Sequence, residues 1–208
     1  QNFFLRQFTE LLITTPLALY LFSGMDKLIV GLGNPGTQYE LNRHNIGHLI
    51  IDELENSLNL RWKEKFKGVY SSVEVCGDKV YFLKPLTYMN LSGESVAPLV
   101  NFFKISIENV LVIHDELDLN MGTIALKDGG GLAGHNGLKS IFEKTGNKNF
   151  KRLRVGIGRP KLGSVSSWVL SDFSQDETPH LEKIINESSC AIKSFLENDF
   201  SSAFRKYK

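Results

Sequence analysis

The chain has 208 residues, of which 42% are hydrophobic and 23% charged, with 24 basic and 23 acidic side chains. This composition is that of one ordinary globular domain, and it excludes disordered, collagen-like and repeat architectures. The two cysteines, Cys76 and Cys190, form no CxxC motif, so they predict neither a disulfide framework nor a cysteine-based zinc site and are typical of a reducing, cytoplasmic compartment.

Residues 1–24 differ in character from the remainder of the chain. They contain an apolar run from Leu17 to Phe22, but no uncharged stretch long enough for a membrane-spanning helix, and the cleavage motif of a signal peptide is poor. Met25 begins a regular pattern, MDKLIVGLGNPG, as a start codon would. We therefore predict that residues 1–24 are an upstream extension outside the functional domain and that residues 25–208 form that domain.

From Met25 onward, strand-like and helix-like segments alternate. Apolar or alternating runs predict strands at 27–31, 69–76, 79–83, 110–114, 122–127 and 152–156, and helical periodicity predicts helices at 46–58, at 96–103 and over 181–195. Gly77-Asp78 predicts a hairpin between two of the strands, and Ser174 to Glu177 is a capping box before the last helix. The pattern indicates a single α/β domain with a twisted mixed sheet flanked by helices.

The segment 31–36, Gly-Leu-Gly-Asn-Pro-Gly, matches the GxGxxG pattern of dinucleotide-binding loops directly after a strand. Its context does not fit such a loop. Pro35 removes a backbone N–H that would face the pyrophosphate, and the acidic residues at the expected distance, Glu53 and Glu55, fall within a predicted helix. A dinucleotide enzyme is therefore a distant third among the functions considered.

A histidine and a carboxylate form the second candidate site. His44 lies between a loop and a predicted helix, and Asp115 follows the strand at 110–114, at the sheet edge where open α/β sheets bind ligands. Such a carboxylate could orient the imidazole as a general base, although spacing alone favours Asp115 as a turn cap. His44 and His48 could together bind a metal, but the HExxH glutamate and a third ligand are missing, so we predict no metal site.

The nucleophile of a hydrolase at this site would be water. The chain contains no GxSxG motif, and Cys76 has no cationic partner nearby in the sequence. Asn34, Asn90 and Asn136 occur in loops bordered by glycine or proline, where a carboxamide could bind a peptide or ester group through both a donor and an acceptor. Taken singly, each asparagine is better explained as a turn or cap residue.

Charge is unevenly distributed along the chain. The segment 139–161 contains eight basic residues and one acidic residue, whereas the segment 172–199 contains seven acidic and two basic residues. Arg152 and Arg154 are predicted to point to one side of a strand, with Lys127 on a neighbouring strand, which would give a coherent basic face suited to a phosphate backbone. An ordinary solvated surface is the alternative.

Five motifs in sequence order resemble the bacterial-type peptidyl-tRNA hydrolase family. They are LIVGLGNPGTQYELNRHNIG (28–47), PLTYMNLSG (85–93), VIHDELDLNMG (112–122), GGGLAGHNGLKSI (129–141) and NFKRLRVGIGRP (149–160). The resemblance runs from Met25 almost to the C-terminus. It implies an enzyme that cleaves the ester bond between a peptide and the 3′ end of tRNA, folded as a monomeric mixed sheet wrapped by helices, with no metal or cofactor.

The resemblance also implies roles for individual residues. His44 takes the role of general base, Asp115 supports it, and Asn34 is tied to catalysis and to telling blocked from free α-amino groups. Further positions match substrate-contacting residues (Tyr39, Tyr88, Met89, Asn90 and Asn136) and residues assigned to tRNA (Lys127 and Arg154). The chain departs from the family after Gly158, where relatives often carry a longer basic loop.

The mechanism that we predict is acyl transfer to water. Neutral His44, oriented by Asp115, removes a proton as water attacks the ester carbonyl, and the Asn34 amide donates to the developing oxyanion. The partner is peptidyl-tRNA, and neither a membrane nor a cofactor takes part. The alternative is a non-catalytic RNA-binding module, for which the basic segment alone would suffice.

Overall fold

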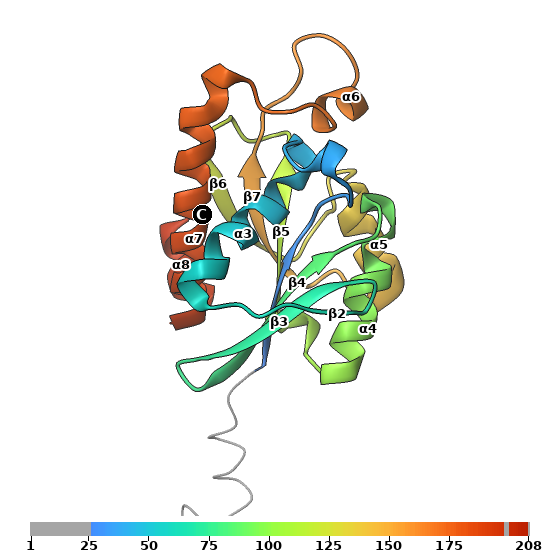
Figure 1. The fold of residues 1–208 in the computed structure, drawn as a ribbon, viewed down its shortest axis with the longest axis vertical. Helices are drawn as coiled ribbons and strands as arrows, with labels where there is room; N and C mark the ends of the chain where they lie inside the picture. The colour runs from blue at the N-terminus through green and yellow to red at the C-terminus, as the bar shows by residue number, and fades with distance from the viewer. Residues whose placement is uncertain (1–25, 198–199, 208) are drawn as a thin grey trace, which may run out of the picture.

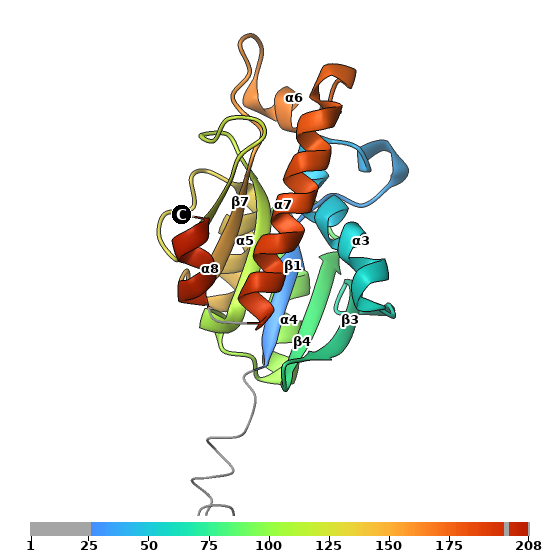
Figure 2. The same ribbon diagram turned by 90° about the vertical axis from the view of Figure 1, so that its left-hand side faces the viewer.

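The computed structural model describes residues 26–197 and 200–207, so the predicted extension at residues 1–24 lies outside the described residues. The described chain forms a seven-stranded sheet with the strand order β2-β3-β4-β1-β5-β7-β6 and helices on both faces (Figures 1 and 2). The predicted fold class, an α/β domain with a mixed sheet flanked by helices, is confirmed.

All of the predicted strands and helices are present. The strands are β1 (Lys27–Gly31), β2 (Lys63–Lys65), β3 (Gly68–Val75), β4 (Asp78–Pro85), β5 (Val110–Glu116), β6 (Ile124–Asp128) and β7 (Lys151–Gly156). The α-helices are α3 (Ile46–Leu58), α4 (Gly93–Phe103), α5 (Asn136–Thr145), α6 (Val165–Val169), α7 (Thr178–Glu197) and α8 (Phe200–Lys206). Single 3-10 turns include η1 (Thr37–Tyr39), η2 (Arg43–Asn45), η3 (Met89–Leu91) and η5 (Gln175–Glu177).

Four parallel strands determine where the site lies. β1 pairs in parallel with β4 and β5, and β5 pairs in parallel with β7, whereas the outer pairs β2–β3, β3–β4 and β6–β7 are antiparallel. The carboxyl ends of β4, β1, β5 and β7 therefore meet at one edge of the sheet, the upper edge in Figure 1. The loops and turns that follow these strands converge there.

Each face of the sheet is covered by its own apolar layer. Ile46, Ile50 and Leu54 of α3 pack with Ile184 and Ile192 of α7 against one face. On the other face, α4 and α5 pack through a second cluster that includes Val96, Leu99, Leu138 and Ile141. Figure 2 shows α3 and α7 in front of the sheet and α4 behind it.

Two glycines bring the start of α3 onto β1. A Cβ atom at Gly31 would lie 2.3 Å from the carbonyl oxygen of Gly47, and a Cβ at Gly47 would lie 2.4 Å from the backbone nitrogen of Leu32. Any larger residue would force these two backbones apart. The glycine pair therefore holds the turn that precedes α3, which carries His44, over the carboxyl end of the central strands.

The structure corrects several details of the sequence-based expectation. α4 begins at Gly93, three residues before the predicted start, and the β3–β4 turn is centred on Cys76-Gly77, with φ angles of 52° and 86°, rather than on Gly77-Asp78. Asn136 is not in a loop but is the first residue of α5. Sequence patterns did not indicate β2, α5, α6 or α8, which are short or of mixed character.

The GxGxxG pattern does not form a dinucleotide-binding loop. The α-helix that follows β1 begins at Ile46, well beyond the glycines, so its N-terminus does not adjoin them. Within the described part of the chain, no helix combines the length and the apolar character needed to cross a membrane.

Candidate active site

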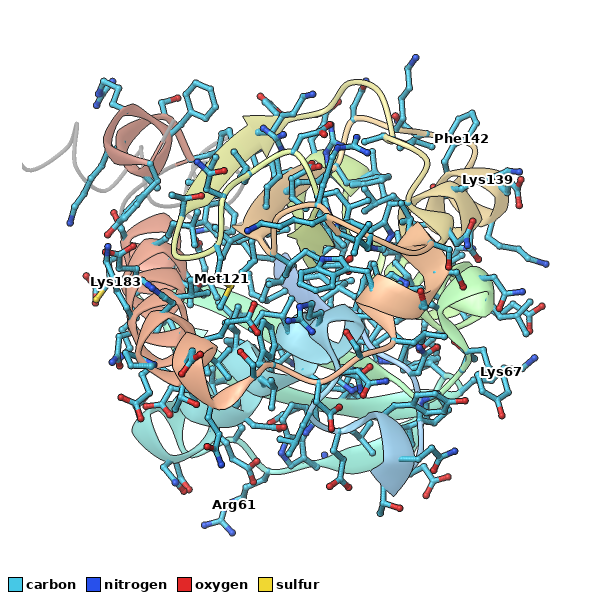
Figure 3. The ribbon with its side chains drawn as sticks, turned by 90° about the horizontal axis from the view of Figure 1, so that it is seen from above. Arg61, Lys67, Met121, Lys139, Phe142 and Lys183 are labelled. Carbon is cyan, nitrogen blue, oxygen red and sulfur yellow. The ribbon has the colours of Figure 1, made fainter. Side chains whose placement is uncertain are left out.

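A cavity of about 450 Å³ lies at the carboxyl edge of the sheet. It is bordered by the loop after β1, by η2 and η3, by the end of β5, by the start of α5 and by α6. Figure 3 looks down onto this edge of the molecule. All eight residues that the sequence assigned to catalysis or substrate binding line the cavity: Asn34, Tyr39, His44, Tyr88, Met89, Asn90, Asp115 and Asn136.

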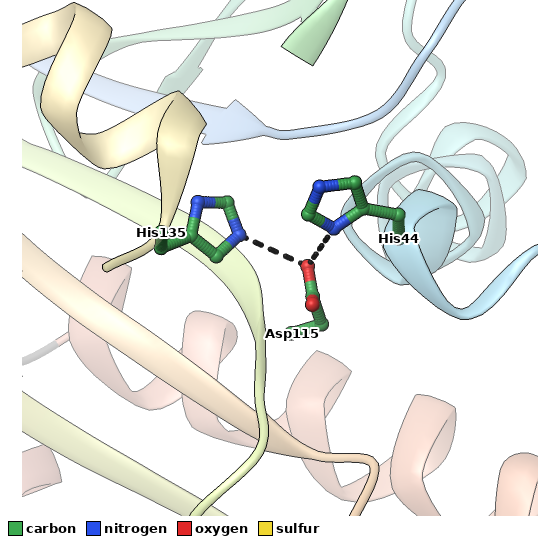
Figure 4. Close-up of side chains that lie close together, drawn as sticks. All are labelled: His44, Asp115 and His135. Atoms are coloured by element: carbon green, nitrogen blue, oxygen red, sulfur yellow. Dashed lines mark hydrogen bonds and ion pairs between the residues drawn. The ribbon is translucent and has the colours of Figure 1, made fainter. Parts of the chain in front are cut away.

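The centre of the cavity is a carboxylate shared by two imidazoles. Asp115 is 4% exposed, and its Oδ1 lies 2.7 Å from Nδ1 of His44 and 3.0 Å from Nε2 of His135 (Figure 4). The rings of the two histidines are 5.0 Å apart. Asp115 is held by β5, His44 by η2 and His135 by the start of α5, so three separate segments deliver side chains to one oxygen atom.

The N-terminus of α5 determines which nitrogen of His135 carries the proton. His135 is the N-cap of α5, and its Nδ1 accepts hydrogen bonds from the backbone N–H groups of Gly137 (3.1 Å) and Leu138 (3.4 Å). A ring nitrogen that accepts has no proton, so the neutral ring carries its proton on Nε2. His135 is therefore a hydrogen-bond donor to Asp115.

Asp115 is ionised in this arrangement. Burial alone would raise the pKa of its carboxyl group, but the neighbouring His44 and His135 and their hydrogen bonds outweigh burial and hold the pKa well below its usual value. An ionised carboxylate only accepts, so Nδ1 of His44 carries the proton that is shared with Asp115. The Nε2 atom of His44 then keeps its lone pair, as a general base requires.

Asn34 is fixed with its amide nitrogen available to a ligand. Its Oδ1 accepts the backbone N–H of Met89 at 2.8 Å, and its own backbone N–H and C=O are both hydrogen-bonded at 2.9 Å by the side chain of Asn45. The Nδ2 atom forms no hydrogen bond with the described residues. The N–H₂ end of the Asn34 amide is therefore the end that the cavity can use.

Two further histidines lie near the site without a hydrogen bond to the Asp115 carboxylate, and one of them, His114, lines the cavity and packs edge to face on His135. Burial, followed by repulsion from His135, lowers the pKa of His114 well below its usual value, and its Nδ1 lies 2.7 Å from the carbonyl oxygen of Asp115. Burial and the charge of Lys84 lower the pKa of His48 to about 3. His48 packs against Gly33 and does not line the cavity, so it is not placed to share a metal ion with His44.

The basic residues assigned to tRNA lie outside the cavity, on the β6–β7 pair. Lys127 is directly opposite Arg152 in the register of these strands, and it forms no ion pair with a described residue. Arg154 donates from Nε to Glu116 at 2.9 Å and keeps 22% of its side chain exposed. The prediction that Arg152 belongs to a basic face is wrong. Arg152 is 1% exposed and donates to the carbonyl oxygens of Gly129 and Gly131.

Three side chains of the site escaped the sequence analysis. His135 forms a hydrogen bond with the Asp115 carboxylate, Asn45 holds the backbone of Asn34, and Glu116 pairs with Arg154. Each lies next to a residue that was singled out, namely Asn136, His44 and Asp115. Their position next to these residues in the sequence was therefore the signal that could have identified them.

The side chains of His44, Asp115 and His135 are close enough to hold a metal ion, because their ligand atoms lie within 4.8 Å of one another. The hydrogen bonds do not fit that use. A metal ligand must offer a lone pair, but Nε2 of His135 carries a proton as long as Nδ1 caps α5. Binding a cation there would require an imidazolate or the loss of the helix cap. The arrangement fits proton transfer instead.

The chain is similar in sequence to known peptidyl-tRNA hydrolases. The model of the family described as Peptidyl-tRNA hydrolase matches residues 28–208. A peptidyl-tRNA hydrolase of Listeria innocua is 44% identical over 182 residues, which cover 87% of this chain and 99% of that protein. One from Staphylococcus haemolyticus is 46% identical over 174 residues, covering 83% of this chain and 92% of that protein.

Solved structures show the same fold. A crystal structure of a peptidyl-tRNA hydrolase in complex with N-propanol superposes with a TM-score of 0.83 at 39% identity, covering 89% of this chain and 98% of that one. The crystal structure of peptidyl-tRNA hydrolase from Acinetobacter baumannii gives a TM-score of 0.82 at 38% identity, covering 89% and 97% of the two chains.

The protonation of His135 leads to a prediction about metals. We expect the purified protein to retain no stoichiometric zinc after gel filtration, and its thermal unfolding midpoint to be the same with and without a chelator. A resident metal at 100 times its Kd would add about 2.7 kcal/mol of apparent stability, which a melting experiment detects readily. Retention of one zinc ion per chain, abolished by His135→Gln, would contradict the proton assignment.

Proposed function

This chain belongs to the peptidyl-tRNA hydrolase family, and from this membership we propose that it hydrolyses the ester bond between peptide and tRNA with a water molecule activated by His44. The products are free tRNA and free peptide. The observation that carries the proposed mechanism is the 2.7 Å contact between Nδ1 of His44 and the buried Asp115, which leaves Nε2 as the basic atom in a cavity large enough for an aminoacyl ester.

The first step is attack by water. Nε2 of His44 takes a proton from water as the oxygen forms a bond to the ester carbonyl carbon, and the carbonyl oxygen becomes an oxyanion. The imidazolium is stabilised by the Asp115 carboxylate at Nδ1. Nδ2 of Asn34 is the donor that we assign to the oxyanion, because its orientation is fixed before substrate binds.

The second step breaks the ester. The tetrahedral intermediate collapses, the bond between the carbonyl carbon and the ribose oxygen breaks, and that oxygen receives the proton from Nε2 of His44. The imidazole returns to its neutral state, and the peptide leaves with a carboxylic acid end. Both steps use one proton-carrying atom, so no second acid is required.

The rest of the cavity is suited to hold the peptide. Tyr39 and Tyr88 meet edge to face with their rings 6.5 Å apart at its mouth, and Asn90 and Asn136 add carboxamides to its wall. We assign these four residues to substrate binding. Met89 is 4% exposed, so it contributes mainly its backbone N–H to Asn34.

We further propose a monomer that acts in the cytoplasm. Every residue of the assigned catalytic set comes from one chain, and both cysteines are exposed and free, as suits a reducing compartment. The alternative function, a non-catalytic RNA-binding module, has no use for the His44–Asp115 pair. Release of peptide from purified peptidyl-tRNA distinguishes the two functions in one assay.

Replacing the general base tests the mechanism. His44→Ala should lower kcat by about 10²–10⁴-fold, because no other group takes the proton from water, and should leave the affinity for tRNA nearly unchanged. Asp115→Asn should also lower kcat, since its side chain keeps the size but loses the charge that stabilises the imidazolium. Both are measured by steady-state hydrolysis of peptidyl-tRNA and by tRNA binding.

A matched control is His180→Ala, which removes an exposed histidine on α7 that does not line the cavity and should behave as wild type. Hydrolysis by His44→Ala at a rate close to that of wild type would show that another group is the base.

Salt dependence tests the residues that we assign to tRNA. Each phosphate that the protein neutralises contributes roughly 0.7 to 0.9 to the slope of log affinity against log salt. Lys127→Ala should therefore weaken tRNA binding and flatten that slope by about one unit. Arg154→Ala should act in the same direction, but it also leaves Glu116, which is 5% exposed, without its ion-pair partner.

Lys67→Ala is the control for this measurement. Lys67 lies between β2 and β3, at the edge of the sheet opposite β6, and pairs with Glu94 of α4. The slope should not change in this variant. A slope that is the same in wild type, Lys127→Ala and Arg154→Ala would remove the β6–β7 pair from the tRNA interface.

The domain boundary gives a further test. We propose that residues 25–208 are the catalytic unit, because the family match begins at residue 28 and every assigned site residue lies after Met25. A chain that starts at Met25 should fold and hydrolyse substrate at a rate close to that of the full chain. Loss of most activity in a truncated chain with an unchanged circular dichroism spectrum would show that residues 1–24 contribute to function.

A further inference from the structure

The residue before the catalytic histidine has an unusual environment. Arg43 is 3% exposed, and its guanidinium points away from the cavity into the segment between α6 and α7. Its hydrogen bonds join Nη1 to Ser171 Oγ (2.7 Å), Ser171 O (3.2 Å) and Asp172 O, and Nη2 to Glu177 Oε2 (2.6 Å). Its guanidinium carbon also lies 3.7 Å from the ring centre of Trp168. One side chain thus binds a segment more than 120 positions away.

The Glu177 carboxylate is held in place for this contact. Its Oε2 atom accepts both the Ser174 backbone N–H at 2.7 Å, in the capping box that precedes α7, and Nη2 of Arg43. Partial burial raises the pKa of Glu177, but these hydrogen bonds outweigh it and keep the pKa below its usual value. The carboxylate is therefore ionised at neutral pH, and the ion pair with Arg43 persists there.

The segment that Arg43 holds is a wall of the active-site cavity. Trp168 belongs to α6, and Val165, Ser166, Val169 and Leu170 line the cavity on this side. α6 has only five residues, and Val165 and Leu170 are 43% and 42% exposed, so apolar packing holds it weakly. Besides the Arg43 side chain, three contacts hold this segment: the hydrogen bond from Trp168 Nε1 to Gly158 O, the backbone hydrogen bond from Arg43 N–H to Ser171 O, and the bridge between Asn42 and Asp172.

The imidazole of His44 depends on other groups. Its ring is positioned by Asp115 through Nδ1, and the backbone of its turn leads directly into α3, whose first residues are buried against β1. The guanidinium of Arg43 forms no hydrogen bond with His44 or Asp115. Changing the Arg43 side chain should therefore displace the wall rather than the base.

We propose that Arg43 is a positioning residue that sets the width of the peptide-binding part of the cavity by holding α6 against the turn that carries His44. This inference rests on the proposed function. Because the wall presents the apolar side chains of Val165, Val169 and Leu170, it contacts the amino acid esterified to tRNA rather than the tRNA body. Arg43 thereby determines how well a bulky apolar residue is held.

Arg43→Lys tests the proposal, because lysine keeps the charge but has neither the planar fork nor the flat face that stacks on Trp168. We expect KM for N-acetylphenylalanyl-tRNA to rise roughly tenfold while kcat and its pH dependence stay within about twofold of wild type. KM for N-acetylglycyl-tRNA should rise less, because glycine has no side chain to meet the wall. The inhibition constant of deacylated tRNA should not change.

Arg205→Lys is the matched control, because Arg205 is exposed on α8 and, among the described residues, donates to Ser202 of the same helix and to no residue of the cavity. It should leave KM and kcat at wild-type values. Glu177→Gln is the second variant, since glutamine keeps the capping box but removes the charge facing Arg43. It should raise KM for the phenylalanyl substrate in the same direction by a smaller factor.

Three results would overturn the proposal. The first is a fall in kcat or a displaced pH profile at constant KM, which would place the action of Arg43 on His44. The second is an equal rise in KM for both substrates and in the inhibition constant of tRNA, which would indicate general loosening. The third applies if Arg43→Lys fails to fold: in that case, a Glu177→Gln variant with the same KM and kcat as wild type would overturn the proposal. Failure of the proposed function is a separate result, because the wild-type chain would then release no peptide.

Discussion

The Oδ1 atom of the buried Asp115 accepts two imidazole N–H groups, and the rest of the site is arranged around this contact. An ionised carboxylate is costly to bury unless hydrogen bonds replace its hydration. His44 and His135 provide that replacement, and in return the carboxylate fixes both rings. Asp115 lies on β5 at the point where the parallel strands end. The sheet therefore fixes the position of the carboxylate, and the turns that carry His44 and His135 must place their rings next to it.

Proton positions follow from the same contact in a fixed order. The free N–H groups at the start of α5 require Nδ1 of His135 to accept, so Nε2 must donate to Asp115. Asp115 remains an acceptor, so Nδ1 of His44 must donate as well, and Nε2 of His44 keeps its lone pair. The helix cap thereby fixes the tautomer of His135, and the ionised carboxylate fixes the tautomer of His44.

Sequence patterns predicted the parts of this site that depend on local order. The apolar run at 110–114 placed Asp115 at a strand end, the period of 46–58 placed His44 just before a helix, and five ordered motifs indicated the family. The alternation of side chains along β7 predicted the side of the strand on which Arg152 lies but not its burial. Its burial depends on the loop at Gly129 to Gly131, whose carbonyl oxygens accept from the guanidinium. His135 was missed because its role needs a partner twenty residues away in the chain.

The substrate has a polyanionic part and a peptide part, and the residues that we propose for each part come from different elements. Lys127 and Arg154 project from the β6–β7 pair, whereas the cavity wall comes from short segments that follow β1, β4 and β7. Among the described residues, Lys127, Arg154 and the side chains of α6 form no hydrogen bond with Asp115, His44 or His135, so changes in these elements leave His44 in place. Arg43 differs from these residues because it contacts both parts of the site. It precedes His44 in the chain, and its side chain extends to α6 and Glu177. That one residue therefore relates the position of the peptide to the position of the base.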